Sequence, residues 1–348
     1  MNAIHTCGWD VGGAHLKFIA LDAAGMVVHA EIYPTPIWQG LHELKQALRQ
    51  AVLICNPATR HAATMTAELA DCFTDRSDGV QAITACLQDA LGAVQIYSLA
   101  GLVSAQTACQ QPVQVGSANW YASATLAARH QADAILIDIG STTTDIVPVI
   151  AGCPQQRGAT DQARMQYDEL VYTGIARTPV MAVVQRAPVA GVWQHLAAEQ
   201  FASMADVYRV LDDLPAAVDC YPAADGGEKT LAASARRLAR MAGADYAVAR
   251  HMIWQDFAAF IAAQQQTLLL AALQRCIANA GAATTAPLIG AGYGRFLVRA
   301  LAQQSQRAYI DFADFLPAQS DELQQAAAAN APAAAVARLC FEQSSRDN

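Results

Sequence analysis

The sequence predicts an α/β protein whose two duplicated halves face each other across a central cleft. Two similar loops, at 10–17 and 138–145, are the first reason, because each follows an apolar, strand-like run and then turns through glycine. They begin 128 positions apart, at position 10 and position 138. The second reason is the succession strand–strand–strand–helix–strand–helix, which opens the chain and begins again near Ala134. We therefore expect an N-terminal domain over 1–132 and a C-terminal domain over 133–348.

Hydrophobic alternation places the elements of the first half. Three strands are expected at 4–9, 15–21 and 26–33, and a hairpin turn at 22–25 joins the last two. The remaining elements alternate in type. We predict a helix at 41–54, a strand at 62–66, a helix at 79–91, a strand at 94–99, and helices at 102–109 and 117–129.

The second half opens with a continuous apolar run at 134–139, which is typical of a buried parallel strand. Its hairpin partner is expected at 144–150, and a helical insertion over about 186–285. The alanine-rich tail at 321–339 predicts a helix pair interrupted near Pro332, with disorder as the alternative. The other expected elements are a polar loop at 152–168, a strand at 180–184, helices at 232–241 and 251–280, a strand at 286–290, a helix at 296–303 and a strand at 308–311.

Length and composition bound the class of protein. At 348 residues the chain exceeds the usual size of one hydrophobic core, which also favours two domains. A formal net charge of −8, without a basic stripe, argues against a nucleic-acid surface. No apolar run approaches the ~20 residues of a membrane span, and residues 1–6 show no export signal. Nine dispersed cysteines without a C-x-x-C pair indicate reduced thiols. We expect a cytoplasmic protein.

The first loop has the composition of a phosphate-binding turn. Glycines let backbone N–H groups approach an anion, lysine adds a compact positive charge, and aspartate holds a hydrated divalent cation. The alternatives are ordinary ones, a turn cap for Asp10 and a solvated edge position for Lys17. We assign phosphate contacts in this loop to Asp10, Gly12, Gly13, Ala14, His15 and Lys17.

The second loop adds hydroxyl groups to the same pattern. Four hydroxylated residues, 141–144, follow Asp-Ile-Gly directly, and this favours phosphate contacts over simple strand formation. Asp138 ends a parallel-type strand, where open α/β sheets place their ligands, and Asp145 is a candidate acid–base group. We assign catalysis to Asp138, Asp145 and Lys17, magnesium binding to Asp10 and Asp138, and phosphate binding to Gly140, Ser141, Thr142 and Thr143.

A third glycine-rich turn, 288–294, stands between an expected strand and an expected helix. Such a turn suits a close backbone approach and an anion at the start of the helix. Glycine turns are common, so this turn is a weak signal by itself. We add Gly290 and Gly292 to the expected phosphate-binding set.

With these three turns in order, the chain resembles the actin-like ATPase superfamily, which includes sugar kinases and Hsp70. That resemblance implies duplicated actin-like, or ribonuclease H-like, domains around a central cleft. Four further blocks resemble the hydantoinase/oxoprolinase-related proteins of tetrahydromethanopterin-linked one-carbon metabolism. The blocks are 65–73 with Arg76 and 79–80, 172–180, 205–209, and Lys229-Thr230 with 237–241.

The narrower resemblance implies a transferase of methanofuran biosynthesis. Such an enzyme would join an aminomethyl-furanmethyl diphosphate to the phenol of a γ-glutamyltyramine-like acceptor and release pyrophosphate. The loops would then hold the diphosphate with Mg²⁺, instead of ATP. Glu68 and Asp145 are the candidate bases for the phenol, and Arg177 binds either the diphosphate or a carboxylate. Residues of the matching blocks that we expect to contact substrate are Thr66, Tyr172, Gly174, Arg177 and Lys229.

Two other functions stay open. The first is an ATP-dependent kinase of a small metabolite, because the glycine turn at 290–294 suits adenosine. The second is a non-catalytic nucleotide-binding partner protein, although intact phosphate loops weigh against it. The partners we expect are small-molecule diphosphate and phenolic amine substrates, without nucleic acid or membrane. The long apolar helix at 251–280 leaves two interpretations, interdomain core or the surface of a homodimer.

Overall fold

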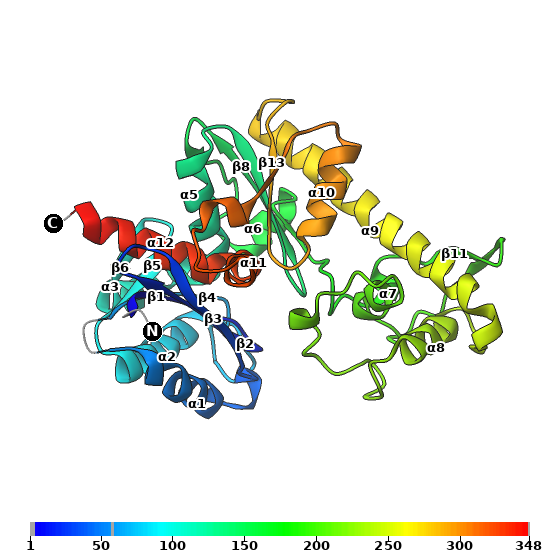
Figure 1. The fold of residues 1–348 in the computed structure, drawn as a ribbon, viewed down its shortest axis with the longest axis horizontal. Helices are drawn as coiled ribbons and strands as arrows, with labels where there is room; N and C mark the ends of the chain where they lie inside the picture. Colours follow the sequence, from blue (N-terminus) through cyan, green and yellow to red (C-terminus); the bar gives the residue numbers. More distant parts are fainter. Residues whose placement is uncertain (1–3, 57–58, 347–348) are drawn as a thin grey trace.

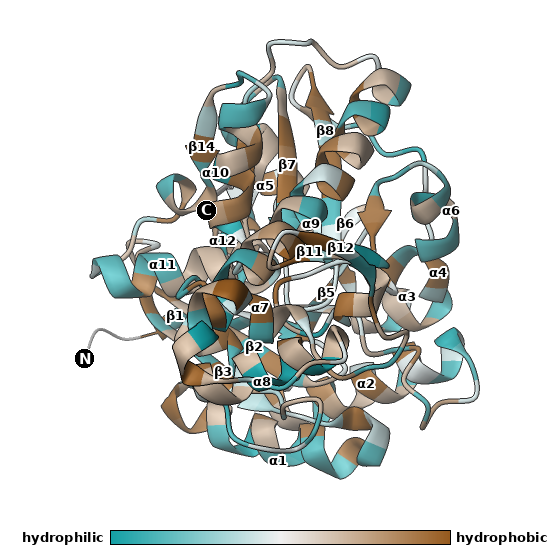
Figure 2. Ribbon diagram, turned by 90° about the vertical axis from the view of Figure 1, so that its right-hand side faces the viewer, coloured by the Kyte–Doolittle hydropathy of each residue, from teal (hydrophilic) through white to brown (hydrophobic). Residues whose placement is uncertain are grey.

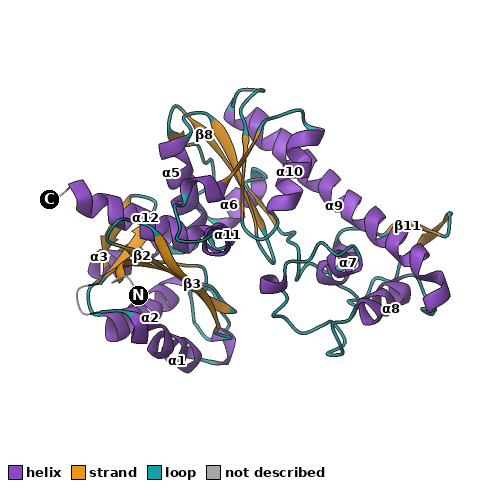
Figure 3. Cartoon of the chain, viewed as in Figure 1, coloured by secondary structure: helices purple, strands orange, loops and turns teal. Residues whose placement is uncertain are grey.

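The computed structural model describes residues 4–56 and 59–346. Two mixed sheets of six strands and one two-stranded sheet organise the molecule. Figures 1 and 3 show the two large sheets in separate bodies, beside a mainly helical lobe that is formed by α7 (Met204–Val210), α8 (Leu231–Met241) and α9 (His251–Ala280). The α/β class predicted from the sequence is confirmed.

The first sheet has the strand order β3-β2-β1-β4-β5-β6. Its central strand β1 pairs antiparallel with β2 and parallel with β4, which places Asp10 near the carboxyl end of β1. The strands are β1 (Ile4–Val11), β2 (His15–Asp22), β3 (Val27–Pro34), β4 (Arg60–Met65), β5 (Val94–Ser98) and β6 (Gly101–Ser104).

The second sheet has the order β10-β8-β7-β13-β14, with β9 added beside β8. Here β7 pairs antiparallel with β8 and parallel with β13, as β1 does with β2 and β4. Figure 2 draws β7 largely in the hydrophobic colour, which agrees with its burial on both faces. The strands are β7 (Ala134–Ile139), β8 (Thr144–Ile150), β9 (Cys153–Pro154), β10 (Leu170–Val171), β13 (Leu288–Ala291) and β14 (Tyr309–Asp311).

Strand order makes the duplication visible. The path β3-β2-β1-β4-β5 of the first sheet corresponds strand for strand to β10-β8-β7-β13-β14 of the second. In both halves the antiparallel hairpin of the two central strands carries one of the loops predicted to bind phosphate. The duplicated fold expected from two short loops is therefore present in the strand topology.

Three clusters of buried hydrophobic residues pack the sheets and helices of the described chain against one another. The first lies between the first sheet and helices α1 and α2, and the second lies between the two sheets around α5 and α12. The third covers the far face of the second sheet with α9 and α10 and continues into the helical lobe. The helices are α1 (Leu41–Ala51), α2 (Arg76–Leu91), α3 (Ala105–Gln110), α4 (Pro112–Val115), α5 (Asn119–His130), α6 (Asp161–Gln166), α10 (Arg295–Gln304), α11 (Asp321–Ala329) and α12 (Ala331–Arg346).

The C-terminal helix α12 returns to the first sheet and packs on β1 and β4. A Cβ atom on Gly8 would lie only 2.0 Å from the carbonyl oxygen of Ala333, so this contact requires glycine on the strand and small residues on the helix. The helix pair expected in the alanine-rich tail is confirmed. Pro332 falls in the first turn of α12, where its missing N–H costs no helical hydrogen bond.

The helical lobe is attached through α9, which packs against β8, α7 and α8. It also contains the two-stranded sheet of β11 (Arg186–Val189) and β12 (Val192–His195). Short 3₁₀ turns complete the chain: η1 (Ile37–Gln39), η2 (Val52–Ile54), η3 (Val180–Ala182), η4 (Ala216–Val218), η5 (Val248–Arg250) and η6 (Phe312–Phe315).

Several element predictions were wrong. The helix expected at 102–109 begins only at residue 105, because 101–104 form the edge strand β6. The polar segment 152–168 contains β9 and the helix α6, whose N-cap is Thr160. The segment 180–184 begins with a 3₁₀ turn instead of a strand.

A hairpin stands where helix was expected after Pro188. Ala190 and Gly191, the two residues of its turn, both have positive φ, 49° and 79°. Positive φ at both turn residues is typical of the tight two-residue turns that join twisted strands. Alanine is uncommon at such positions, so the sequence did not indicate this turn. The boundaries of the two domains and of the insertion at about 186–285 remain our proposal. Among the described residues, no helix combines the length and the hydrophobicity that a bilayer crossing requires.

Candidate functional site

Both predicted phosphate loops have the same local geometry. The amide of Gly12 donates to the carbonyl of His15 at 2.9 Å, and the amide of Gly140 donates to the carbonyl of Thr143 at 2.9 Å. Each of these hydrogen bonds closes a tight turn at the end of a hairpin. Glycine at the start of each turn leaves the backbone open to an approaching anion.

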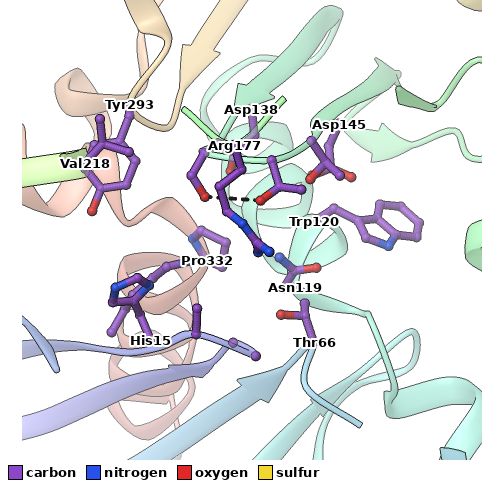
Figure 4. A pocket seen from close by; sticks show the side chains of 18 of the residues that line it. His15, Thr66, Asn119, Trp120, Asp138, Asp145, Arg177, Val218, Tyr293 and Pro332 are labelled. Carbon is purple, nitrogen blue, oxygen red and sulfur yellow. Dashed lines mark hydrogen bonds between the residues drawn. The ribbon is translucent and has the colours of Figure 1, made fainter. Parts of the chain in front are cut away.

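The two loops line one cavity of about 340 Å³. Figure 4 shows His15 and Thr66 on one side and Asp138 and Asp145 on the other, with the Arg177 side chain reaching between them. The structure thus brings together most of the predicted site residues. Those that line the cavity are Gly12, Gly13, Ala14, His15, Lys17, Thr66, Asp138, Gly140, Ser141, Thr142, Thr143, Asp145, Tyr172 and Arg177.

Lys17 is the cation of the first loop. Strand pairing sets it opposite Asp10, and its Nζ lies 2.7 Å from Asp10 Oδ2. Burial by itself would lower the pKa of Lys17, but the adjoining Asp10 carboxylate outweighs it and the pKa is raised. Lys17 is therefore charged across the physiological range, and 27 % of its side chain is exposed toward the cavity.

Asp10 itself lies behind Lys17 and is fully buried. Its second oxygen, Oδ1, has no hydrogen-bond partner among the described residues. A buried carboxylate oxygen without a donor is costly unless water or a cation reaches it. Asp10 thus holds Lys17 in place with one oxygen and leaves the other, Oδ1, without a partner among the described residues.

The second loop carries two acids instead of an ion pair. Asp138 and Asp145 are paired across β7 and β8, and Asp138 is 8 % exposed. Burial and the neighbouring Asp145 raise the pKa of Asp138 to about 7. The pKa of Asp145 is also raised, mainly by burial, although Arg164 Nη1 donates to its Oδ1 at 2.7 Å.

Arg164 is a site residue that the sequence did not reveal. Its guanidinium lies 3.9 Å from the centre of the Trp120 ring and is almost fully buried. It belongs to α6, in the segment that was expected to be a loop. The Thr160 cap before an acidic first turn was the signal that could have placed a helix there.

Tyr221 crosses from the helical lobe to both loops and was also missed. Its hydroxyl lies 3.1 Å from His15 Nδ1 and 3.1 Å from Ser141 Oγ. The other ring nitrogen of His15 lies 3.2 Å from the Cys220 sulfur. Burial, then Lys17 and Arg177, lower the pKa of His15 to about 4, so the ring is neutral at pH 7. One side chain therefore links the two phosphate loops.

Gly174 supports the second loop from behind. A Cβ at this position would lie 2.6 Å from the carbonyl oxygen of Gly140. The amide of Arg177 donates to the carbonyl of Ser141 at 2.8 Å, and Gln265 of α9 donates to Gly174 at 2.9 Å. The block predicted to bind substrate thus also fixes loop geometry, and its Arg177 side chain enters the cavity.

Glu68 does not line the cavity. It is fully buried, accepts a hydrogen bond from Ser117 at 2.8 Å and has Arg76 at 4.0 Å. Burial raises the pKa of Glu68. Lys229 also lies outside the cavity lining, where its Nζ donates to the carbonyl of Asp219 at 2.6 Å. Roles for both in catalysis or substrate binding stay predictions.

The third glycine turn lies behind Asp138. A Cβ on Gly292, which has a φ of 78°, would lie 2.3 Å from Asp138 Oδ1. A Cβ on Gly290 would meet the Tyr309 ring at 2.7 Å. Neither glycine lines the cavity, whereas the adjoining Tyr293 does. The turn permits close packing around Asp138, and phosphate contacts by Gly290 and Gly292 stay a prediction.

The donor set fits a magnesium ion held partly by substrate. No cluster of three metal-ligating side chains exists among the residues that the structure describes. Mg²⁺ commonly takes one or two carboxylates and completes its shell with water and phosphate oxygens. Asp138 on the cavity wall meets that requirement, whereas Asp10, with its unpartnered Oδ1, does not line the cavity. Magnesium binding by the two residues stays a prediction.

Comparison with known proteins identifies the family. The family model described as hydantoinase/oxoprolinase matches residues 60–342. The chain belongs to the hydantoinase/oxoprolinase family. In a solved structure, the nucleotide-free form of acetone carboxylase is similar over 97 % of this chain and 70 % of that chain, with a TM-score of 0.62 and 9 % identity. This likeness concerns the fold, and the actin-like architecture expected from the three turns is confirmed.

Curated relatives of this hydantoinase/oxoprolinase chain carry one name, (4-{4-[2-(gamma-L-glutamylamino)ethyl]phenoxymethyl}furan-2-yl)methanamine synthase. The protein from Methanocaldococcus jannaschii is 32 % identical over 253 residues, which is 72 % of this chain and 73 % of the relative. The protein from Methanococcus vannielii is 36 % identical over 80 residues, 23 % of this chain and 36 % of the relative. Both relatives are synthases of an aryl ether that carries a furan and a glutamyl group.

Proposed function

We propose that this chain is a transferase of methanofuran-type biosynthesis. It would join an aminomethyl-furanmethyl diphosphate to the phenol of a γ-glutamyltyramine-like acceptor. The observation that carries the proposal is the single cavity lined by both phosphate loops, with Lys17 on one side and Asp138 and Asp145 on the other. The ether in the relatives' product name supplies the bond that such a cavity would form.

In this reaction the phenolic oxygen forms a bond to the furanmethyl carbon while the bond from that carbon to the diphosphate oxygen breaks. Electron donation from the furan ring stabilises positive charge on the carbon. The leaving pyrophosphate gathers negative charge, which Lys17 and the backbone amides of both loops are placed to stabilise. Magnesium held at Asp138 and Asp10 would supply further neutralisation of the leaving oxygens.

Asp145 is the base that this geometry favours. It lines the cavity, whereas Glu68 does not, and Arg164 fixes one of its oxygens. Its raised pKa makes the carboxylate a stronger proton acceptor than an ordinary aspartate. The phenolic proton would pass to Asp145 as the ether bond forms, and then to solvent.

Substitution of Asp145 tests the proposal. The Asp145→Asn variant keeps an oxygen for Arg164 but loses the base, so ether formation should fall by about 10²–10⁴-fold. The measurement is pyrophosphate release together with mass detection of the ether product. The matched control is Asp133→Asn, an exposed position just before β7, the strand that pairs with β8, and it should retain wild-type rates. Wild-type protein that forms no ether with magnesium and both substrates would contradict the proposal.

An ATP-dependent kinase is the second candidate function. The cavity extends past the loops to Tyr293, Ala329 and Pro332, beside the turn that suited adenosine in the sequence. Magnesium-dependent formation of ADP would favour this candidate, and pyrophosphate release without ATP would favour the transferase. A protein that binds ATP without any turnover would be the non-catalytic partner considered from the sequence.

A further inference from the structure

A second cavity, of about 350 Å³, opens beside the first. The two share Arg177, Val218 and Tyr221 as a common wall. The helical lobe provides most of the second cavity, and Trp38 of the first half, which is 49 % exposed, lines it as well. Cavities of roughly 300–1,000 Å³ hold small-molecule ligands. The two cavities are therefore adjacent, and a ligand that occupies both must pass these three shared residues.

The second cavity has a rigid, charged floor. Arg237 is 1 % exposed and binds Asp206 at 2.8 Å, which fixes Asp206 in the cavity wall. Arg209 lies between Asp206 at 3.3 Å and Asp219 at 2.7 Å. Because these ion pairs hold each other, the Arg209 guanidinium and the Asp219 carboxylate are positioned before any ligand binds.

Charges of both signs are presented to the cavity. Asp219, which also has Lys229 Nζ at 3.4 Å from its Oδ1, keeps about a quarter of its side chain exposed, and Arg209 about a seventh. A ligand that carries an ammonium and a carboxylate on one carbon has the complementary pair. An anion alone would meet Asp206 and Asp219, and a cation alone would meet Arg209. The lining thus favours a zwitterion over either single charge.

Arg177 is left for the first cavity. Among the described residues, no carboxylate lies within ion-pair distance of its guanidinium, which lies 5.3 Å from the centre of the Tyr221 ring. Figure 4 shows this side chain reaching into the first cavity. Its charge is therefore available to the diphosphate, whereas Arg209 and Asp219 line the second cavity alone.

We infer that the second cavity is the subsite for the amino-acid head group of the acceptor, a zwitterion joined by a short chain to a phenol. This inference rests on the proposed function. The ammonium pairs with Asp219, the α-carboxylate with Arg209, and Trp38 packs on the connecting chain. The phenol passes the shared wall at Tyr221 and reaches Asp145. The relatives' product name contains such a glutamyl group on the far side of the phenoxy ring.

Two substitutions and one matched control test the subsite. Trp38→Ala removes an exposed side chain at the cavity mouth, and Trp193→Ala removes one that is 58 % exposed on β12, away from both cavities. Trp38→Ala should raise the dissociation constant of γ-glutamyltyramine by about tenfold, the value of ~1.4 kcal/mol of aromatic contact. Trp193→Ala should leave it unchanged. Calorimetric titration of the full chain measures both.

Asp219→Asn tests the zwitterion directly. Wild-type protein should bind γ-glutamyltyramine about tenfold more tightly than the glutaryl analogue, which lacks only the ammonium. Asp219→Asn should remove that preference and leave the affinity for inorganic pyrophosphate unchanged.

The titration separates this inference from the proposed function. Equal effects of Trp38→Ala and Trp193→Ala, a preference that survives Asp219→Asn, or wild-type protein that does not bind γ-glutamyltyramine would overturn the subsite. Binding with the predicted pattern supports the subsite even if no ether is formed, and in that case only the proposed reaction fails.

Discussion

The two loops at the cavity share a backbone and differ in charge. Both turns close with the same 2.9 Å hydrogen bond, and in both an aspartate on the inner strand faces a residue on the returning strand. In the first half that residue is Lys17, which neutralises Asp10. In the second half it is Asp145, which repels Asp138. The charges of Asp10 and Lys17 therefore cancel within the first loop. The two acids of the second loop need a proton or a cation from elsewhere.

The difference shows how a duplicated fold acquires chemistry. The glycine turns preserve the approach of an anion to both loops, while a single change of charge at one paired position separates their roles. In our proposal the first loop is a fixed positive site, and the second is an acid–base and cation site. Three substitutions break or sharpen this comparison.

Removing the Lys17–Asp10 ion pair of the first loop should have the largest effect on stability. Lys17→Met leaves the buried Asp10 carboxylate without its partner, which should lower the free energy of unfolding by about 4 kcal/mol. Denaturant unfolding monitored by circular dichroism measures this loss. The double variant Lys17→Met/Asp10→Asn should regain most of the stability, because no buried charge remains. A double variant as unstable as the single one would contradict the balance that we assign to this loop.

Removing the repulsion in the second loop should act in the opposite direction and depend on pH. Because the pKa of Asp138 is raised to about 7 from 3.8, the folded state binds this proton more tightly than the unfolded state. The stability that Asp138 contributes is thus complete below pH 3.8 and is lost as the pH rises through 7. Relative to wild type, Asp138→Asn should therefore gain about 3–4 kcal/mol between pH 4 and pH 8.

Thermal unfolding in the presence of a chelator at pH 4 and pH 8 checks the Asp138 effect. The control is Asp89→Asn, an exposed carboxylate on α2. Its difference from wild type should be the same at both pH values. If Asp138→Asn behaves like Asp89→Asn, the repulsion between the paired acids is absent.

Removing the Tyr221 contact between the two loops should have the smallest effect on stability. Tyr221→Phe removes the hydroxyl that contacts His15 and Ser141 while keeping the ring, so the free energy of unfolding should fall by about 1 kcal/mol. Affinity for inorganic pyrophosphate, measured by titration, should weaken as well, because the two loops are no longer held at one spacing. An unchanged affinity would mean that the loops keep their separation without Tyr221.

The two loops could be predicted from the sequence because the residues that form each turn lie close together in the chain. Asp10 and Lys17 stand at the two ends of one hairpin, and glycine between them is needed by the turn itself. The strands around them are buried on both faces, which leaves a clear run of apolar residues. The duplicated topology follows from the same short-range patterns.

The rest of the site depends on contacts between distant segments. Tyr221 reaches His15 across 206 positions, and nothing near Tyr221 in the chain indicates a partner. Glu68 was a candidate base because its block resembles the family, but the chain turns after β4 and buries it against Ser117. Gly174 looked like a substrate contact, and its neighbours instead show close packing on the second loop.

The position of α12 has a consequence for synthesis on the ribosome. The first sheet is complete in the chain by residue 104, but one of its faces is covered by alanines of the last helix, residues 331–346. At roughly 5–20 residues per second, a nascent chain would carry that face uncovered for on the order of tens of seconds. Chaperones that recognise apolar strands are expected to bind the newly made first half of the molecule until residues 331–346 have been synthesised.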